Sequence, residues 1–245
     1  MIHALLVAVA LGTATASAAE PTYTECTLVN PSLTVNGEKI AMGRGFVATV
    51  GERTLFVTSH QVLGPAGGRD KQLSAKEAQA GFTQLVARDV FTSKECGRAK
   101  RMLAIEGAAM DLGAHGRDDV AAFLVDKSLD NKFSTAVKPL SLADSAPAKG
   151  DTVWLATRTS TKGRLVPAKI AEVNDNFVFY DFPEVKADDL MGSVGGPMLD
   201  AQGKVVGLHV GIGQLADGTL FGAANPVSSL KKHLAAELLP EKAAE

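Results

Sequence analysis

The chain has 245 residues, of which 46% are hydrophobic, and its formal net charge at pH 7 is -2. This length suits one domain of roughly 200 residues or two small packed halves, and the hydrophobic content is ample for a core. The near-neutral charge argues against a nucleic-acid or membrane-surface partner. The 24 glycines, spread among many short apolar runs, are typical of an all-β protein rich in turns.

The N-terminal segment predicts export. An apolar run over residues 2–11 is followed by small residues that end in Ala16-Ser17-Ala18. This is the pattern of a secretory signal peptide that is cleaved after Ala18, and the run is too short to span a bilayer. No Lys or Arg precedes the run, and a buried N-terminal helix is the alternative interpretation. We expect a signal peptide over residues 1–18 and a secreted or periplasmic mature protein without a membrane span.

Cys26 and Cys96 are the only two cysteines. In an oxidising compartment such a pair often forms one disulfide. Both cysteines lie beside polar, turn-like residues rather than within an apolar strand, and this favours a disulfide over two free thiols.

The first third of the chain carries hairpin and helix signals. The pair Asn36-Gly37 is typical of a two-residue hairpin turn, here after a short strand over residues 33–35. A second hairpin is predicted from the β-rich runs 45–50 and 53–58. The capping box Ser74-Ala75-Lys76-Glu77 then predicts a short helix that ends near residue 80.

The rest of the chain continues in short apolar runs. Further predicted strands cover residues 84–88, 102–105, 120–125, 152–157, 165–173, 177–182, 204–210 and 219–223. Leu230, Leu234 and Leu238 recur at helical spacing and predict a C-terminal amphipathic helix over residues 227–239. Many short strands with a division near residue 135 fit two packed antiparallel barrels, although a single large sandwich fits the same pattern.

The most specific motif lies between Met191 and Leu199, where the chain reads Met-Gly-Ser-Val-Gly-Gly-Pro-Met-Leu. It resembles the nucleophile loop of trypsin-like serine peptidases, which runs Gly-x-Ser-Gly-Gly-Pro. A gapless match puts Gly192 first and Val194 at the nucleophile position. The resemblance implies an oxyanion hole formed by the N–H groups of Gly192 and Val194. Ser193 is either a nucleophile one position early or a small turn residue that bonds the local backbone.

Two earlier segments carry the same resemblance. Residues 43–47 read Gly-Arg-Gly-Phe-Val, and residues 55–62 read Leu-Phe-Val-Thr-Ser-His-Gln-Val. They are similar to the family's paired strands, the second of which ends in Thr-x-x-His, and they imply that His60 is the general base. The residue three before His60 is Val57 rather than threonine, and the alternative is a histidine satisfied in a turn. Asp119 opens an Asp-Val-Ala strand and is implied to orient His60.

The segments after the loop extend the resemblance. Residues 203–211 are similar to the strand that lines the substrate cleft, so His209, Val210 and Gly211 are expected to contact a bound peptide; a strand histidine without a role is the alternative for His209. Residues 221–227 resemble a stretch of bacterial high-temperature-requirement proteases, whose added peptide-binding domains are not expected here. Asp188 falls where trypsin-like enzymes keep the base of the primary specificity pocket, but it also fits a solvated loop.

The resemblance selects an all-β fold of two packed six-stranded antiparallel β-barrels. A short helix follows the first histidine strand, and a second helix closes the chain. We expect an N-terminal half over residues 19–135 that carries His60 and Asp119. The C-terminal half, residues 136–238, is expected to hold the loop at 191–197 and the terminal helix, with a tail over 239–245.

Three hypotheses about function follow. The first is a pseudo-peptidase, without its nucleophile, that binds extended peptide or protein segments. The second is an active serine endopeptidase in which Ser193 acts with His60 and Asp119; it requires a rearranged turn, because neighbouring residues of extended backbone point in opposite directions. The third is an unrelated secreted β-protein with a structural role. No cofactor or metal is expected, because His115 and His209 have neither a partner at helical spacing nor a cysteine cluster.

Overall fold

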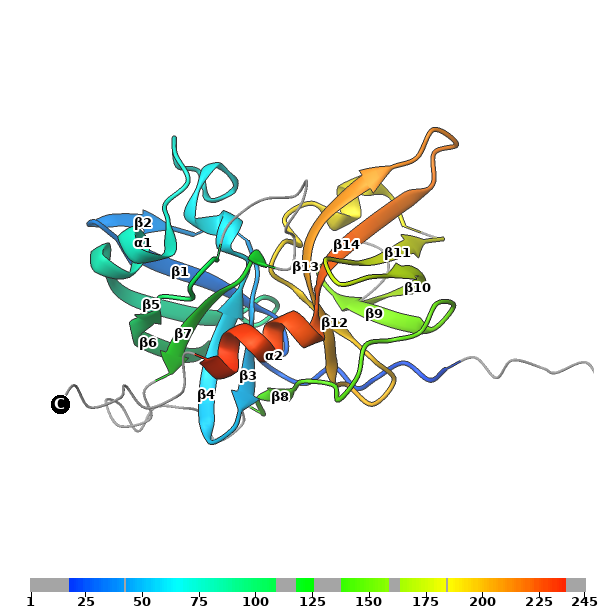
Figure 1. Ribbon diagram of the computed structural model, residues 1–245, viewed down its shortest axis with the longest axis horizontal. Helices are drawn as coiled ribbons and strands as arrows, with labels where there is room; N and C mark the ends of the chain where they lie inside the picture. The colour runs from blue at the N-terminus through cyan, green and yellow to red at the C-terminus, as the bar shows by residue number, and fades with distance from the viewer. Residues whose placement is uncertain are drawn as a thin grey trace, which may run out of the picture.

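The computed structural model describes residues 18–41, 43–108, 118–125, 138–158, 164–183 and 185–236. Within these ranges the protein is mostly β, in two halves that lie side by side with one α-helix across their junction (Figure 1). The predicted signal peptide (except Ala18), the expected boundary at residue 135, His115 and the tail lie outside the described residues. No helix among the described residues is long and apolar enough to cross a membrane.

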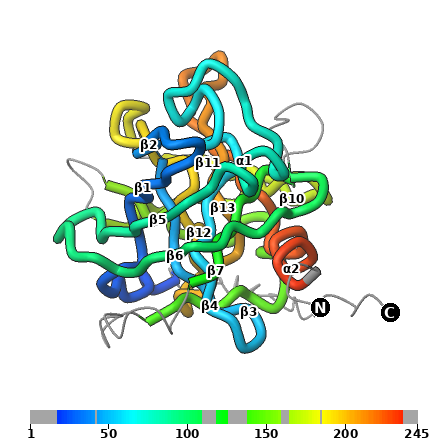
Figure 2. Tube along the Cα trace, turned by 90° about the vertical axis from the view of Figure 1, so that its left-hand side faces the viewer, coloured from blue at the N-terminus to red at the C-terminus, as the bar shows by residue number. Residues whose placement is uncertain are grey.

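The N-terminal half is an eight-stranded sheet in the order β2-β1-β5-β6-β7-β4-β3-β8. Its strands are β1 (Val29–Val35), β2 (Glu38–Ile40), β3 (Phe46–Val50), β4 (Arg53–Thr58), β5 (Phe82–Asp89), β6 (Glu95–Leu103), β7 (Ala121–Val125) and β8 (Leu140–Ser141). Val29 and Gly45 exchange two backbone hydrogen bonds of 2.8 and 3.0 Å. This bridge brings the ends of the run β1-β5-β6-β7-β4-β3 together, so the sheet curls into the expected barrel shape. Figure 2 shows β1, β5, β6 and β7 from this side, with the C-terminal helix at the edge.

The C-terminal half is a closed barrel in the order β10-β11-β14-β13-β12-β9. Its strands are β9 (Thr152–Ala156), β10 (Leu165–Val173), β11 (Val178–Phe182), β12 (Pro197–Leu199), β13 (Val205–Gln214) and β14 (Leu220–Pro226). All of its pairings are antiparallel. The all-β fold with two barrel-like halves is therefore confirmed.

Two α-helices and three short 3₁₀ helices complete the described structure. They are α1 (Ala75–Gly81), α2 (Val227–Ala236), η1 (His60–Leu63), η2 (Pro65–Gly67) and η4 (Ala187–Leu190). The predicted capping box of α1 is present, since the Ser74 hydroxyl accepts from the Glu77 N–H and the Glu77 carboxylate accepts from Ser74. The strand predicted at 102–105 is the end of a longer β6, and β12 is a three-residue strand that the turn-rich motif concealed.

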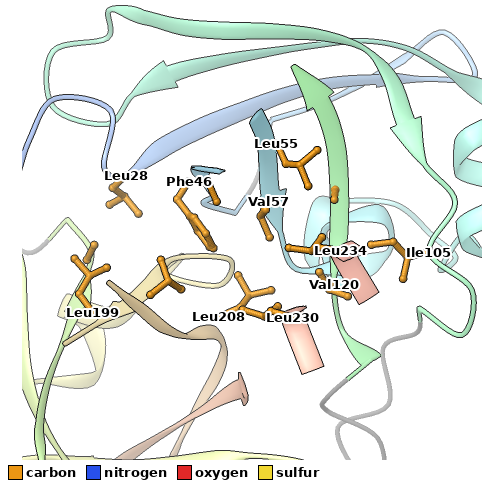
Figure 3. Packing of buried hydrophobic residues seen from close by; sticks show 14 of the residues in the cluster. Leu28, Phe46, Leu55, Val57, Ile105, Val120, Leu199, Leu208, Leu230 and Leu234 are labelled. Atoms are coloured by element: carbon orange, nitrogen blue, oxygen red, sulfur yellow. The ribbon is translucent and has the colours of Figure 1, made fainter. Parts of the chain in front are cut away.

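A shared hydrophobic core joins the two halves. Leu230 and Leu234 of α2 are fully buried, and they pack with Val120, Phe46 and Leu208 among others (Figure 3). Because this cluster draws side chains from β3, β13 and the segment before β7, the helix fixes the two halves against each other. The predicted disulfide between Cys26 and Cys96 is present, with a Cα–Cα distance of 5.8 Å, and it links the segment before β1 to β6.

Candidate active site

Asp119 lies fully buried just before β7 and is held by hydrogen-bond donors from the end of β4. The Ser59 hydroxyl lies 2.8 and 2.7 Å from its two carboxylate oxygens. The backbone N–H of Gln61 donates at 2.9 Å and the Gln61 side chain donates at 2.8 Å. Burial raises the pKa of Asp119, against the hydrogen bonds from Ser59 and Gln61 that lower it.

The Gln61 side chain spans the junction of the two halves. Its Nε2 donates one hydrogen bond to Asp119 Oδ2 and a second, of 2.7 Å, to the carbonyl oxygen of Val210 on β13. Both N–H donors of the carboxamide are thereby used. A neutral carboxamide does not take up a proton at neutral pH, so Gln61 cannot serve as a general base.

The sequence predicted that Asp119 orients His60, but His60 forms no hydrogen bond with Asp119 in the structure. Its side chain is 1% exposed and its Nε2 bonds the carbonyl oxygen of Leu73 at 2.8 Å, while Nδ1 is buried and has no hydrogen-bond partner. Burial lowers the pKa of His60. The structure thus places His60 in a turn against the Leu73 carbonyl oxygen, with only one of its two ring nitrogens hydrogen-bonded, and it places Gln61 against the aspartate instead.

A spacing signal in the sequence could have found Gln61. The pattern Thr-x-x-His fits Thr58-Ser59-His60-Gln61 without a gap when Gln61 stands in the place of the histidine. The mismatch at Val57 marks the one-residue error of the His60 assignment.

The loop over residues 191–197 is held by backbone hydrogen bonds from both halves. Gly195 N–H donates to the His209 carbonyl oxygen at 2.8 Å, and the Arg44 N–H donates to the Val194 carbonyl oxygen at 2.7 Å. At Gly195, which has a φ of +89°, a Cβ would lie 2.1 Å from the Arg44 carbonyl oxygen, so only glycine fits. The backbone of the loop is therefore fixed even though its central side chain is valine.

Ser193 is turned into the protein. It is 1% exposed, and its hydroxyl donates to the carbonyl oxygen of Leu190 at 2.6 Å. Neither Asp119 nor a histidine contacts it among the described residues. This is the geometry of a turn residue that bonds the local backbone, and it does not position Ser193 as a nucleophile. Val194, the residue at the nucleophile position, is half-buried.

The expected cleft residues have different surroundings. The side chain of His209 is fully buried against the Tyr180 hydroxyl, so it does not face a ligand. Burial also lowers the pKa of His209 to about 3. The carbonyl oxygen of Val210 accepts from Gln61, as described above. Gly211 is half-buried, and a Cβ built on it would meet no atom within 4 Å, so it borders open space.

Asp188 is exposed within the 3₁₀ helix η4 rather than placed at the base of a pocket. This position agrees with the solvated-loop interpretation. Among the described residues, no group of three or more His, Cys, Asp or Glu side chains lies together as metal ligands would.

Two β-barrel halves, with a buried aspartate and a Gly-Gly-Pro loop at their junction, define the chymotrypsin-like architecture. Residues 43–208 match the trypsin-like peptidase domain family, and the chain belongs to that family. The third hypothesis, an unrelated β-protein, is thereby removed. No curated protein matches the sequence.

Solved structures of bacterial proteases share the fold at low sequence identity. The Rv3671c protease of M. tuberculosis in its active form is 17% identical, with a TM-score of 0.52 over 95% of this chain and 93% of that chain. The serine endoprotease of Yersinia pestis is 14% identical, with a TM-score of 0.54 over 88% of this chain and 64% of that one. The HtrA-type protease AlgW, solved with a tripeptide, is 16% identical, with a TM-score of 0.54 over 89% of this chain and 62% of that one.

Proposed function

We propose that this protein is an exported pseudo-peptidase that binds extended peptide or protein segments and does not hydrolyse them. One observation carries the proposal: the residue that joins Asp119 to β13 is Gln61, and the loop opposite presents Val194. Two of the three side chains that a serine peptidase needs are thus replaced by groups without the required chemistry.

The chemical consequence of these replacements is large. Valine has no oxygen that could attack a carbonyl carbon, and a carboxamide cannot accept the proton that a nucleophile releases. In a comparable triad enzyme, loss of the serine or the histidine alone costs about 10⁶-fold in kcat. The retained aspartate supplies neither function, because its role is to orient a histidine.

Peptide binding is supported by the edge of β13. Among the described residues, β12 pairs with β13 only up to Leu208, whereas β14 pairs with it as far as Gln214. Residues 211–214 therefore have one side without a strand partner, next to the open space at Gly211. An extended peptide can add to such an edge through main-chain hydrogen bonds.

Export is supported by two features. The sequence predicts a signal peptide cleaved after Ala18, and the Cys26–Cys96 disulfide suits an oxidising compartment.

The proposal is tested by measuring both the binding and the cleavage of random hexapeptides by the native protein. Peptides immobilised through their N-termini are used to measure retention of the protein, and the same library in solution is analysed by mass spectrometry for cleavage products. We expect retention without cleavage. Gly211→Leu adds a side chain to the open space and is expected to weaken retention at least about tenfold, whereas Lys232→Leu, on the exposed face of α2, is a control that should leave it unchanged.

Two outcomes would overturn the proposal. Cleavage products that vanish in Ser193→Ala would establish an active endopeptidase. Absence of retention from all peptides, with a folded protein shown by circular dichroism, would remove the binding function.

A further inference from the structure

Arg44 stands beside the loop that carries Val194. Its backbone is fixed on both sides, since its N–H donates to the Val194 carbonyl oxygen at 2.7 Å and its own carbonyl oxygen accepts from the Thr58 hydroxyl at 2.5 Å. Its Nη2 atom lies 3.9 Å from the point that a Cβ on Gly192 would occupy. The guanidinium group therefore lies directly beside Gly192.

The positive charge of Arg44 has no counter-charge in the described structure. Nη1 donates to the carbonyl oxygen of Gly43 at 3.0 Å, but Nε is buried without a partner. No carboxylate among the described residues forms an ion pair with Arg44 or with the nearby Arg158. Burial, and then the like charge of Arg158, lower the pKa of Arg44. A half-buried cation with unused donors, next to a second cation, lacks an anion.

The loop beside Arg44 carries further donors. Within the ranges that the structure describes, the N–H groups of Gly192 and Val194 donate to no protein acceptor. Gly192 is exposed and has a φ of +72°, a conformation that glycine adopts without strain. Free backbone N–H groups beside a guanidinium group form a set of donors without acceptors.

We propose that Arg44, together with the N–H groups of Gly192 and Val194, binds the C-terminal carboxylate of a peptide that lies along β13. This inference rests on the proposed peptide-binding function and names the feature of the ligand that the site recognises. Arg158 contributes long-range attraction from its exposed position after β9.

The chemistry of the site selects a carboxylate. A guanidinium group offers parallel N–H donors in a planar fork that matches the two oxygens of a carboxylate. Burial of the group limits its hydration, so the charge-assisted hydrogen bonds are stronger than they would be on an open surface.

The position of Arg44 beside the loop favours a peptide that ends at this point over one that continues past it. A peptide that pairs antiparallel to β13 at residues 211–214 has its C-terminal end toward His209, whose backbone is hydrogen-bonded to Gly195 and Gly196 of the loop. Arg44 lies next to this loop, and its backbone N–H donates a hydrogen bond to the Val194 carbonyl oxygen. The guanidinium group thus lies where a chain that follows this path meets the opposite half, and a terminal carboxylate at this point satisfies the free donors.

The test compares two hexapeptide libraries that differ only at the C-terminus, one as free acids and one as amides, both immobilised through their N-termini. We expect the native protein to bind the free acids at least about tenfold more tightly than the amides. Arg44→Gln should remove this preference, and Arg44→Lys should retain part of it, because lysine keeps the charge but not the fork. Arg53→Gln, at the exposed first residue of β4, is the matched control and should keep the preference.

The outcomes separate this inference from the proposed function. Equal binding of acids and amides would overturn the carboxylate site and leave the peptide-binding function standing. Binding of amides with selection for internal Asp or Glu would also overturn it, in favour of a side-chain carboxylate. Failure of both libraries to bind would contradict the proposed function itself. Melting curves of the Arg44 variants that match the native protein exclude misfolding as the cause of a loss.

Discussion

The surroundings of Asp119 and the loop at Val194 differ in how completely their polar groups are satisfied. At Asp119, a hydroxyl, a backbone N–H and a carboxamide all donate to one buried carboxylate, and the carboxamide also bonds Val210. At the loop, two N–H groups and part of the Arg44 guanidinium have no acceptor among the described residues.

The difference predicts two separate roles for these two regions. The donors around Asp119 form a closed network in which the Gln61 carboxamide links the two halves. At the loop, the N–H groups of Gly192 and Val194 have no protein acceptor among the described residues, and we propose that a ligand binds them. We therefore expect changes near Asp119 to alter mainly the free energy of unfolding, and changes near Arg44 to alter mainly binding.

The largest effect is expected for Asp119→Ala. It leaves the buried donors of Ser59 and Gln61 without an acceptor, and the free energy of unfolding should fall by about 3 kcal/mol or more. Urea denaturation measures the change, with the exposed Asp175→Ala as the control. A loss no greater than that of the control would show that the network around Asp119 is not structural.

The pH dependence of stability tests the burial of the His209 side chain against Tyr180. Its folded-state pKa of about 3 lies below the ordinary value near 6.5, so the folded state binds fewer protons than the unfolded state between these values. Burial of the neutral imidazole therefore stabilises the folded state fully above pH 6.5, and this contribution is lost as the pH falls. At pH 5 the free energy of unfolding should be lower by about 2 kcal/mol. His209→Asn should lack this part of the dependence in denaturation series between pH 7 and pH 5. If the free energy of unfolding depended on pH equally in the native protein and in His209→Asn, the lowered pKa of His209 would be contradicted.

A smaller effect is expected for Ser193→Ala. The variant loses the hydrogen bond to the Leu190 carbonyl oxygen, which should cost about 1 kcal/mol of unfolding free energy. Peptide retention should stay unchanged, because the hydroxyl points into the protein. A selective loss of retention at native stability would indicate a functional role for this serine.

The smallest effect on stability is expected for Arg44→Met. Because the guanidinium group has no counter-charge among the described residues, its removal should leave the melting temperature unchanged or raise it slightly. Binding of free-acid peptides should fall in the same protein. A marked drop in melting temperature would mean that Arg44 has a structural role, which would weaken the contrast between the two regions.

Local signals predicted much of the fold. The Asn36-Gly37 hairpin, the capping box at Ser74, the strands of both halves and the disulfide depend on neighbouring residues or on a single cysteine pair, and all are present. The loop motif also identified the family. These features are encoded over a few residues, where turn geometry and side-chain period are strong constraints.

The partner of Asp119 was harder to predict, because His60 and Gln61 are neighbours at the point where β4 passes into a 3₁₀ helix. Which of the two side chains faces the junction depends on the backbone of that turn and on the contacts of Leu73 and Val210, which are distant in sequence from one another. The free guanidinium of Arg44 likewise depends on a contact with residues near 192 that no local pattern reveals.

The rate of labelling by a fluorophosphonate probe tests most directly whether Gln61 and Val194 occupy the positions of the catalytic histidine and serine. We expect no labelling of the native protein or of Val194→Ser, because His60 does not contact Asp119. We expect labelling of the double variant Gln61→His with Val194→Ser, in which the aspartate, histidine and serine are present together. Labelling of Val194→Ser alone that is lost on adding His60→Ala would show that His60 is the general base, and would contradict the assignment of that position to Gln61.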